Sequence, residues 1–487
     1  MGGFSRREFI DVLGEWKGPA AVVPRPGDSP VVRLNKAAAA LTFRGGGFLY
    51  VPETLVLEPE GTVAGRAWRP TVYVPANVTM LFKSGALLDL RAGVILEIEG
   101  GIAHGARQLF RVPDADGVHV VMTGYQLPRV YPEWWGAGAG RDDTVALQAA
   151  VDAACNLRRL GPRVGTQLPP VELSLAGRYV VRAPIEVGYR DALPQPTELP
   201  EVVNASAKIV GTRGADGEVG TIVAGAGFVD RAPAQHHGAL VRLRDVFGWS
   251  VENVVFDAVN RAARCVVVDI SPPRPGTTRQ DQAGSLRRCT FRGATDTLVN
   301  AGAVGQPRGP KGAPPAKEPS GGDLLCLRFE GCGFFPVQDQ GIGLQLRAGN
   351  TLPMVVTGCV FEGTAAAMIY ALAGSFTVEG CRFRNDREPR NPPKLEGPGT
   401  PDGSDIYLGH ETFEGGATTT SPPPRAAGDA VRDPQQALPG DLLPRLRAAR
   451  QGWYGPPGDP HRCVAAHGDA PHGGIDRVGV LRAGSAE

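Results

Sequence analysis

The sequence predicts a parallel β-helix, a solenoid in which short strands stack coil upon coil. Two observations support this fold. Glycine (66 residues) and proline (44 residues) make up more than a fifth of the 487-residue chain, as expected for short strands joined by many turns. In addition, one strand-like motif recurs through the middle of the chain, and such self-similarity is the signature of a solenoid.

The repeated motif reads apolar, polar, small or polar, Cys or Val, any residue, Phe. It occurs five times, at Val251–Phe256, Leu286–Phe291, Phe329–Phe334, Val356–Phe361 and Val378–Phe383. The interval between the last two phenylalanines is 22 residues, close to one coil, and the longer intervals contain loops. Because side chains alternate along a strand, we expect Cys and Phe to point into the solenoid in every coil.

The stacked motifs predict a ladder of four buried cysteines beside the ladder of phenylalanines: Cys289, Cys332, Cys359 and Cys381. Free cysteine is small and apolar and is readily buried. Neighbouring coils lie about 4.8 Å apart, but parallel side chains lack disulfide geometry, so free thiols are expected. The chain has eight cysteines and no CxxC pair, which excludes a zinc ribbon or a thioredoxin-like site.

The residue before each Cys is expected at a corner, where the backbone adopts the left-handed conformation that glycine tolerates best. These corner residues are Asn253, Arg288, Gly331, Gly358 and Gly380. A second strand then follows in each coil, at Cys265–Ile270, Asp296–Asn300, Gly341–Leu346 and Ala367–Ala371. The loops after these strands, at 271–284, 301–323 and 347–353, should collect on one side of the rod, and the last coil should have almost none.

Upstream of the coils, residues 72–100 are predicted to form short strands, and residues 142–155 a helix that Asp142 or Asp143 can cap. The segments VPANVTMLFKSGALLDL and YPEWWGAGAGRDDTVALQAAVDAA resemble the N-terminal cap of the pectate-lyase-like superfamily, which includes rhamnogalacturonase-like enzymes and phage tailspikes. This resemblance implies a right-handed β-helix whose open end is covered by the helix. It also implies a homotrimer, as in tailspikes, and a location outside the cell, at a cell surface or on a virion-like particle.

Four regions are expected along the chain: an N-terminal extension (1–45), a β-rich head (46–135), the solenoid (136–385) and a partly extended Pro/Gly-rich tail (386–487). The segment Ser5–Ile10 has the form of a twin-arginine export motif. Charged residues interrupt the apolar run that should follow it, so a short amphipathic helix is the preferred interpretation.

Candidate binding residues follow each phenylalanine of the repeat, on the outer surface: Asp257, Arg292, Phe335, Glu362 and Arg384. Opposite charges one coil apart predict surface ion pairs. The same row is also interpreted as one wall of a sugar-binding groove, with Phe335 as a stacking platform. On the loop at 301–323, Arg308 and Lys311 make the surface locally basic, so an acidic polysaccharide is the expected partner.

Catalysis has no clear signature in the coils. Polygalacturonases of this fold carry Asn-x-Asp, Asp-Asp, Gly-His-Gly and Arg-x-Lys motifs, which the coils lack. Hydrolysis needs two carboxyls within about 5–9.5 Å, whereas Asp257 and Glu362 are three coils, or about 14 Å, apart. Catalytic residues are therefore unassigned, with four candidates: Asp257, Asp269, Asp296 and Asp339.

Two functions remain open, because this fold does not fix function. The first is a carbohydrate-directed protein that binds a polysaccharide at a surface and, as a hydrolase or lyase, cleaves it. The second is a non-catalytic structural or receptor-binding component of a phage-tail-like or cell-surface assembly. No cofactor or metal site is expected, and no apolar stretch approaches the ~18 residues of a membrane span. The net charge of +1 predicts no overall electrostatic attraction to nucleic acid.

Overall fold

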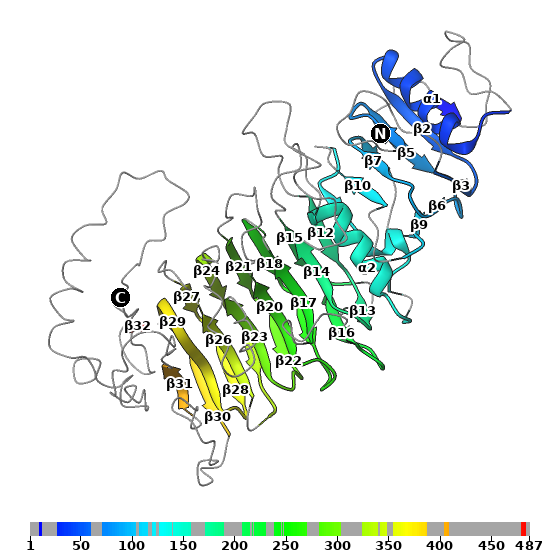
Figure 1. Ribbon diagram of the computed structural model, residues 1–487. Helices are drawn as coiled ribbons and strands as arrows, with labels where there is room; N and C mark the ends of the chain where they lie inside the picture. Colours follow the sequence, from blue (N-terminus) through cyan, green and yellow to red (C-terminus); the bar gives the residue numbers. More distant parts are fainter. Residues whose placement is uncertain are drawn as a thin grey trace, which may run out of the picture.

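In the computed structural model, strands predominate and stack coil upon coil along one axis (Figure 1). The structure describes residues 9–11, 27–59, 71–103, 107–114, 119–122, 126–138, 140–156, 171–188, 207–214, 217, 219–229, 238–244, 246, 248–269, 282–302, 324–338, 341–347, 354–386, 404–408 and 479–483. Every pairing among the described strands is parallel except that of the C-terminal strand β32 (Gly479–Ala483). The predicted right-handed parallel β-helix is confirmed.

The N-terminal head is a small β-helix of its own. Equivalent strands of successive coils pair in parallel and form three sheets, β2–β5–β8, β3–β6–β9 and β4–β7–β10. The strands in chain order are β2 (Gly47–Val51), β3 (Leu55–Leu57), β4 (Val72–Val74), β5 (Val78–Phe82), β6 (Leu88–Leu90), β7 (Leu96–Ile98), β8 (Gly101–Ile102), β9 (Phe110–Arg111) and β10 (Val120–Met122). The short strands predicted over residues 72–100 are therefore confirmed.

The head also contains two elements that the sequence interpretation did not predict. Helix α1 (Pro30–Phe43) packs against β2, β3 and β4, one strand of each sheet, and so covers the open end of the head (Figure 1). It begins at Ser29, whose hydroxyl accepts a hydrogen bond from the Val32 backbone N–H at 3.3 Å. Strand β1 (Phe9–Asp11) pairs with β2, so the interpretation of this segment as an amphipathic helix is wrong there.

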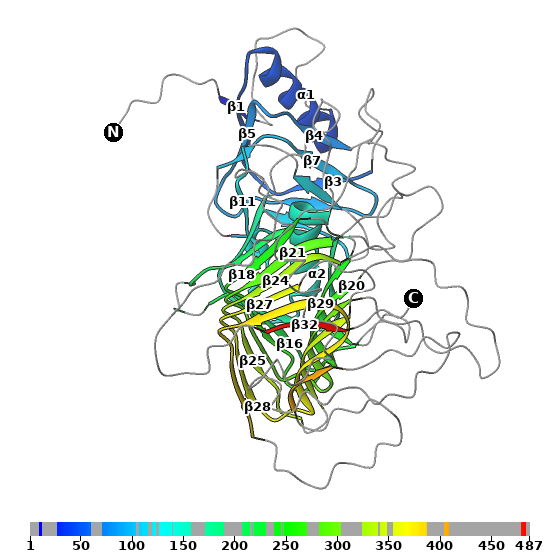
Figure 2. The same ribbon diagram turned by 90° about the vertical axis from the view of Figure 1, so that its left-hand side faces the viewer.

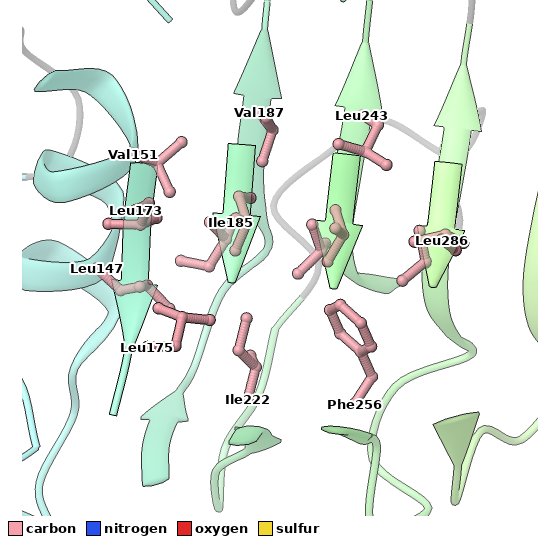
Figure 3. A pocket seen from close by; sticks show the side chains of 14 residues that line it. Leu147, Val151, Leu173, Leu175, Ile185, Val187, Ile222, Leu243, Phe256 and Leu286 are labelled. Atoms are coloured by element: carbon pink, nitrogen blue, oxygen red, sulfur yellow. The ribbon is translucent and has the colours of Figure 1, made fainter. Parts of the chain in front are cut away.

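A second cap lies between the head and the main solenoid. Strand β11 (Arg129–Val130) and the short 3-10 helix η1 (Pro132–Trp135) lead into α2 (Thr144–Val151), which a π-helical turn, η2 (Asp152–Asn156), continues. These bounds agree with the predicted helix at 142–155. The side chains of Leu147 and Val151 point from α2 into the opening of the solenoid (Figure 3). The predicted capping helix is therefore confirmed.

The two aspartates at the start of α2 have different roles. Asp142 accepts a hydrogen bond from the Thr144 backbone N–H at 3.1 Å, which is a capping contact as predicted. The Asp143 carboxylate accepts from the backbone N–H groups of Gly138 (2.9 Å) and Val180 (2.8 Å) instead. Burial raises the pKa of Asp143, although these two hydrogen bonds oppose the shift. Asp143 therefore ties the cap to the first coil.

The main solenoid has three walls, which each coil visits in the same order. The first wall contains β12 (Glu172–Leu175), β15 (Lys208–Gly211), β18 (Trp249–Glu252), β21 (Gln282–Arg287), β24 (Leu324–Glu330), β27 (Met354–Thr357) and the end of β29 (Ala367–Glu379). The second wall contains β13 (Arg178–Val181), β16 (Thr221–Ala224), β19 (Val255–Asp257), β22 (Thr290–Arg292), β25 (Gly333–Phe335), β28 (Val360–Gly363) and β30 (Arg382–Asn385). The third wall contains β14 (Ile185–Gly188), β17 (Ala239–Arg244), β20 (Arg264–Asp269), β23 (Thr297–Gly302), β26 (Ile342–Arg347), the start of β29 and β31 (Ser404–Leu408).

The last coils close the described solenoid in an unexpected way. Strand β29 runs without a break from the third wall into the first, which agrees with the expectation of almost no loop in this coil. Strand β32 (Gly479–Ala483), from the predicted tail, pairs antiparallel with the second half of β29 (Figure 2). The loops predicted at the end of the third wall lie mostly outside the described residues. No helix in the described part of the chain is long and apolar enough to span a membrane.

The interior of the second wall is the predicted ladder. Phe256, Phe291, Phe334, Phe361 and Phe383 are partners in successive strands. Their rings stack with centroids 4.5–5.3 Å apart. The four ladder cysteines are free thiols, three of them buried and the last one half-buried. Each thiol donates a hydrogen bond to a backbone carbonyl of the preceding coil, as Cys332 does to Leu286 at 3.2 Å.

The corner residues before each cysteine are left-handed, as the motif predicts. Their φ angles are 55° at Asn253, 52° at Arg288, 61° at Gly331 and Gly358, and 58° at Gly380. Only glycine adopts this conformation without a steric cost. The corner therefore explains why three of the five motifs carry glycine at that position.

Candidate functional site

The residues that follow the inward phenylalanines line up on the outer surface of the second wall. In the parallel ladder, Asp257 is the partner of Arg292, Arg292 of Phe335, and Glu362 of Arg384. We call these five residues the outer row. Alternation along each strand places them outside, because the residue before each one belongs to the phenylalanine ladder, which is buried except for the half-buried Phe383. The predicted arrangement is confirmed, whereas its role in binding stays a prediction.

The charged members of the outer row are ion-paired between neighbouring coils. Arg292 binds one carboxylate oxygen of Asp257 through both Nη2 (2.8 Å) and Nε (2.9 Å). Arg384 binds Glu362 through Nη1 and Asp386 through Nε, both at 3.0 Å. The Arg292 and Arg384 side chains remain 54% and 58% exposed. Each guanidinium is thus held in place by carboxylates and still faces solvent.

Phe335 interrupts this series of charges with an aromatic surface. A Cβ atom added to Gly333 would lie only 2.7 Å from Cε2 of Phe335. The phenyl ring therefore lies back over the glycine of its own strand, on the outer surface of the wall, and is half-buried. A side chain at position 333 would displace the ring. Gly333 occupies the position of the repeated motif at which any residue is allowed. A glycine there was the signal in the sequence from which the placement of the Phe335 ring could have been predicted.

A second group of side chains lies on β20 and β23, two neighbouring strands of the third wall. Arg264 and Thr297, the first residues of β20 and β23, are partners in the parallel ladder, and Asn300 is the partner of Val267. We call Arg264, Thr297 and Asn300 the polar cluster. Their exposures are only 8%, 1% and 3%. Sequence reasoning missed all three, although Asn300 lies between the apolar, inward-facing Val299 and Ala301 in an alternating strand.

Arg264 connects the polar cluster to one of the catalytic candidates. Its Nη2 lies 3.0 Å from Oδ2 of Asp296, a residue at the corner just before β23 that the sequence had placed in the strand. One coil earlier, Arg242 of β17 lies 3.3 Å from Glu186 of β14. Buried or half-buried arginines paired with carboxylates are therefore a repeated feature of the third wall.

The two catalytic candidates whose side chains the structure describes, Asp257 and Asp296, are both ion-paired. Asp257 is bound by Arg292 on the second wall, and Asp296 by Arg264 at the corner. Asp269 ends β20 opposite Arg244, but its side chain is not described. Asp339, Arg308 and Lys311 lie outside the described residues. Among the described residues, no group of three or more His, Cys, Asp or Glu side chains could hold a metal ion.

The solenoid interior contains a cavity near its N-terminal end, next to α2 (Figure 3). Fourteen side chains line it, all of them apolar, and they come from α2 and from inward positions of all three walls. Leu147, Ile185, Phe256 and Leu286 are among them. The cavity offers no hydrogen-bonding group, so a polar ligand would find no partner there.

No family model matches the sequence, and no curated protein matches it. Solved structures that are similar include the ORF18 protein of Geobacillus virus E2 (14% identity, TM-score 0.34, 58% of this chain and 47% of that one). Another is the tailspike of E. coli bacteriophage HK620 in complex with a pentasaccharide (12%, 0.32, 74% and 58%). A third is the A-module of the Azotobacter vinelandii mannuronan C-5 epimerase AlgE4 (9%, 0.29, 81% and 96%).

The chain thus spans about half to three fifths of the length of the two viral proteins. The identities and TM-scores are low, so these likenesses concern the fold and carry no functional argument. The assignment of the fold rests on the parallel register of the walls themselves.

Proposed function

We propose that this chain binds a polysaccharide along the outer surface of the second wall and acts at the surface of a cell or particle. The observation that carries the proposal is the outer row, in which the exposed face of Phe335 lies between ion-paired charges. Sugars present apolar ring faces and polar edges. Aromatic rings and fixed charged groups suit these two kinds of surface.

The direction of the outer row also suits a chain-like ligand. Its members come from successive coils, which lie about 4.8 Å apart along the rod. A polysaccharide laid along this axis would meet one member of the row per coil. Arg292 and Arg384 are held by carboxylates in the free protein, so little side-chain freedom is lost when a sugar hydroxyl binds them.

Binding without cleavage is the version that the described residues favour. Both described candidate carboxylates, Asp257 and Asp296, are already held by arginines. This supports a receptor-binding or adhesive component rather than a hydrolase or lyase. Cleavage is the competing outcome, and the same experiment detects it.

The test is affinity electrophoresis of the full chain in gels that contain alginate, polygalacturonate or dextran. The wild type should be retarded by at least one polymer. Phe335→Ala should weaken that retardation about fivefold, the equivalent of roughly 1 kcal/mol for one lost aromatic contact. Phe43→Ala is the matched control, because Phe43 is an exposed phenylalanine (80%) on the head, away from the outer row.

Two results would contradict the proposal: no retardation by any polymer, or equal retardation of the wild type and Phe335→Ala. Reducing ends and unsaturated uronates should be measured on the same polymers. Their release would show that the chain is an enzyme and would contradict the non-catalytic version.

A further inference from the structure

Four polar atoms of the polar cluster lack a hydrogen-bond partner among the described residues. Arg264 Nε and Nη1, Thr297 Oγ1 and Asn300 Oδ1 are buried and have no partner within the part of the chain that the structure describes. Buried polar atoms in proteins are nearly always hydrogen-bonded, because losing water without replacement is costly. Three such residues on two neighbouring strands therefore indicate a partner that the described part of the chain does not supply.

The register shows that Asn300 points away from the interior. Its neighbours along β23, Val299 and Ala301, belong to the hydrophobic core, so Asn300 takes the outward position between them. In the next two coils, Gln345 and Tyr370 continue the same row. An outward series of two amides and a phenol offers both donors and acceptors of hydrogen bonds.

The charges of the cluster distinguish between possible ligands. The guanidinium of Arg264 already faces the carboxylate of Asp296 at 3.0 Å, so its charge is matched within the chain. Arg264 Nε and Nη1 are donors, Asn300 Oδ1 is an acceptor, and the Thr297 hydroxyl is both. A carboxylate or sulfate only accepts, so it would leave Asn300 unsatisfied. Sugar hydroxyls donate and accept, and they can satisfy the whole set.

We propose that the polar cluster is a subsite for the hydroxyl groups of a neutral sugar unit. The inference rests on the proposed function and narrows it: at this position the polysaccharide carries an uncharged residue, in contrast to the acidic partner expected from the sequence. The cluster is close to the outer row along the chain, because Asp296 follows Arg292 by four residues at the corner between the second and third walls.

The test compares isosteric variants on the full chain. Thr297→Val removes the buried hydroxyl and keeps the shape of the side chain. Thr357→Val is the matched control, since Thr357 lies on the first wall and is half-buried. The probes are dextran, alginate, polygalacturonate and the carboxyl-reduced forms of the last two, with retardation in gels and thermal unfolding as readouts.

Thr297→Val should weaken retardation by a neutral polymer about fivefold, which corresponds to one hydrogen bond of about 1 kcal/mol. Its thermal midpoint should stay the same or rise, because the free protein loses a buried polar atom that had no partner. Asn300→Leu should behave in the same way. Thr357→Val should change neither retardation nor the midpoint.

The outcomes separate this inference from the proposed function. Retardation that depends on Phe335 but not on Thr297 or Asn300 would overturn the subsite and leave the proposed function standing. A lower thermal midpoint with unchanged retardation would assign the cluster to internal structure or ordered water. If Thr297→Val and Asn300→Leu lost retardation only by the acidic polymers, the assignment of a neutral sugar to this subsite would be overturned. Absence of any retardation of the wild type would overturn both proposals.

Discussion

Two ladders run along the second wall, one residue apart in the sequence. The inner ladder repeats one residue type, phenylalanine, and its rings stack at 4.5–5.3 Å in the core. The outer row changes from coil to coil between acid, base and aromatic residues. The same strands and the same register therefore support both sets. The difference teaches that the interior constrains residue type strictly, because one shape must fill each coil, whereas the outside constrains only position.

The largest expected effect comes from placing a charge in the inner ladder. Cys359 is fully buried, and its thiol donates to the Phe329 carbonyl at 3.4 Å. Cys359→Asp should prevent folding, since an unpaired buried carboxylate costs several kcal/mol out of a typical total of about 5–15 kcal/mol. Circular dichroism and soluble yield measure this. A folded, soluble Cys359→Asp protein would contradict the packing of the inner ladder.

The neighbouring pair Phe334 and Phe335 gives the sharpest test of the difference between the ladders. Phe334→Ala should lower the free energy of unfolding by about 3–5 kcal/mol, because it leaves a cavity between two stacked rings. Phe335→Ala should lower it by less than about 1.5 kcal/mol, since that ring is only half-buried. Urea unfolding of both variants measures the two values. Equal losses would mean that the outer row is a structural element as well.

The inner ladder should also respond to alkaline pH. The neighbouring Cys289 thiol raises the pKa of Cys332 to about 12, and the neighbouring Cys332 thiol raises that of Cys359 to about 12. Between the ordinary thiol pKa of about 8.5 and about 12, the unfolded chain releases protons that the folded chain keeps. Stability therefore falls as pH rises through this range.

Urea midpoints at pH 8, 9.5 and 10.5 measure this dependence. Other groups also titrate there, so the relevant quantity is the difference between the wild type and a Cys332→Val, Cys359→Val double variant. The double variant should lose less stability than the wild type over this range. Parallel curves would contradict a thiol contribution.

The smallest expected effect is on the outer ion pairs. Arg292→Ala should change the free energy of unfolding by no more than about 1 kcal/mol, because Arg292 is more than half exposed and water screens its pairing with Asp257. In the gel assay the same variant should weaken retardation. A loss of stability above about 2 kcal/mol, with unchanged retardation, would assign the pair to folding rather than to binding.

The interior was the most predictable part of this molecule. The Cys and Phe positions, the left-handed corners and the strands of the coils follow from alternation and from repetition, which one sequence displays directly. The outer row was predictable for the same reason, since its members sit at a fixed offset from each phenylalanine. The function of that row was not, because its residue types do not repeat.

The features that escaped the sequence interpretation depend on three-dimensional contacts. The pairing of Arg264 with Thr297 joins strands that lie in different coils, separated by an irregular interval. Helix α1 covers the head, yet its alanine-rich sequence carries only a weak apolar pattern. Phe9–Asp11 forms a strand because β2 offers it an edge, which overrides the local preference.

The stacking of equivalent coils makes the length of this rod an adjustable quantity. Each coil adds about 4.8 Å to the rod and one member to the outer row. The number of coils therefore sets the length of the outer surface that a bound chain can contact. Removing the coil that carries Phe335 would bring Arg292 beside Glu362, and these two charges are again opposite. A duplicated or deleted coil would thus preserve the inner stack of phenylalanines while changing the order of groups outside. Such rearrangements offer a route by which related rods could acquire new partners without a new fold.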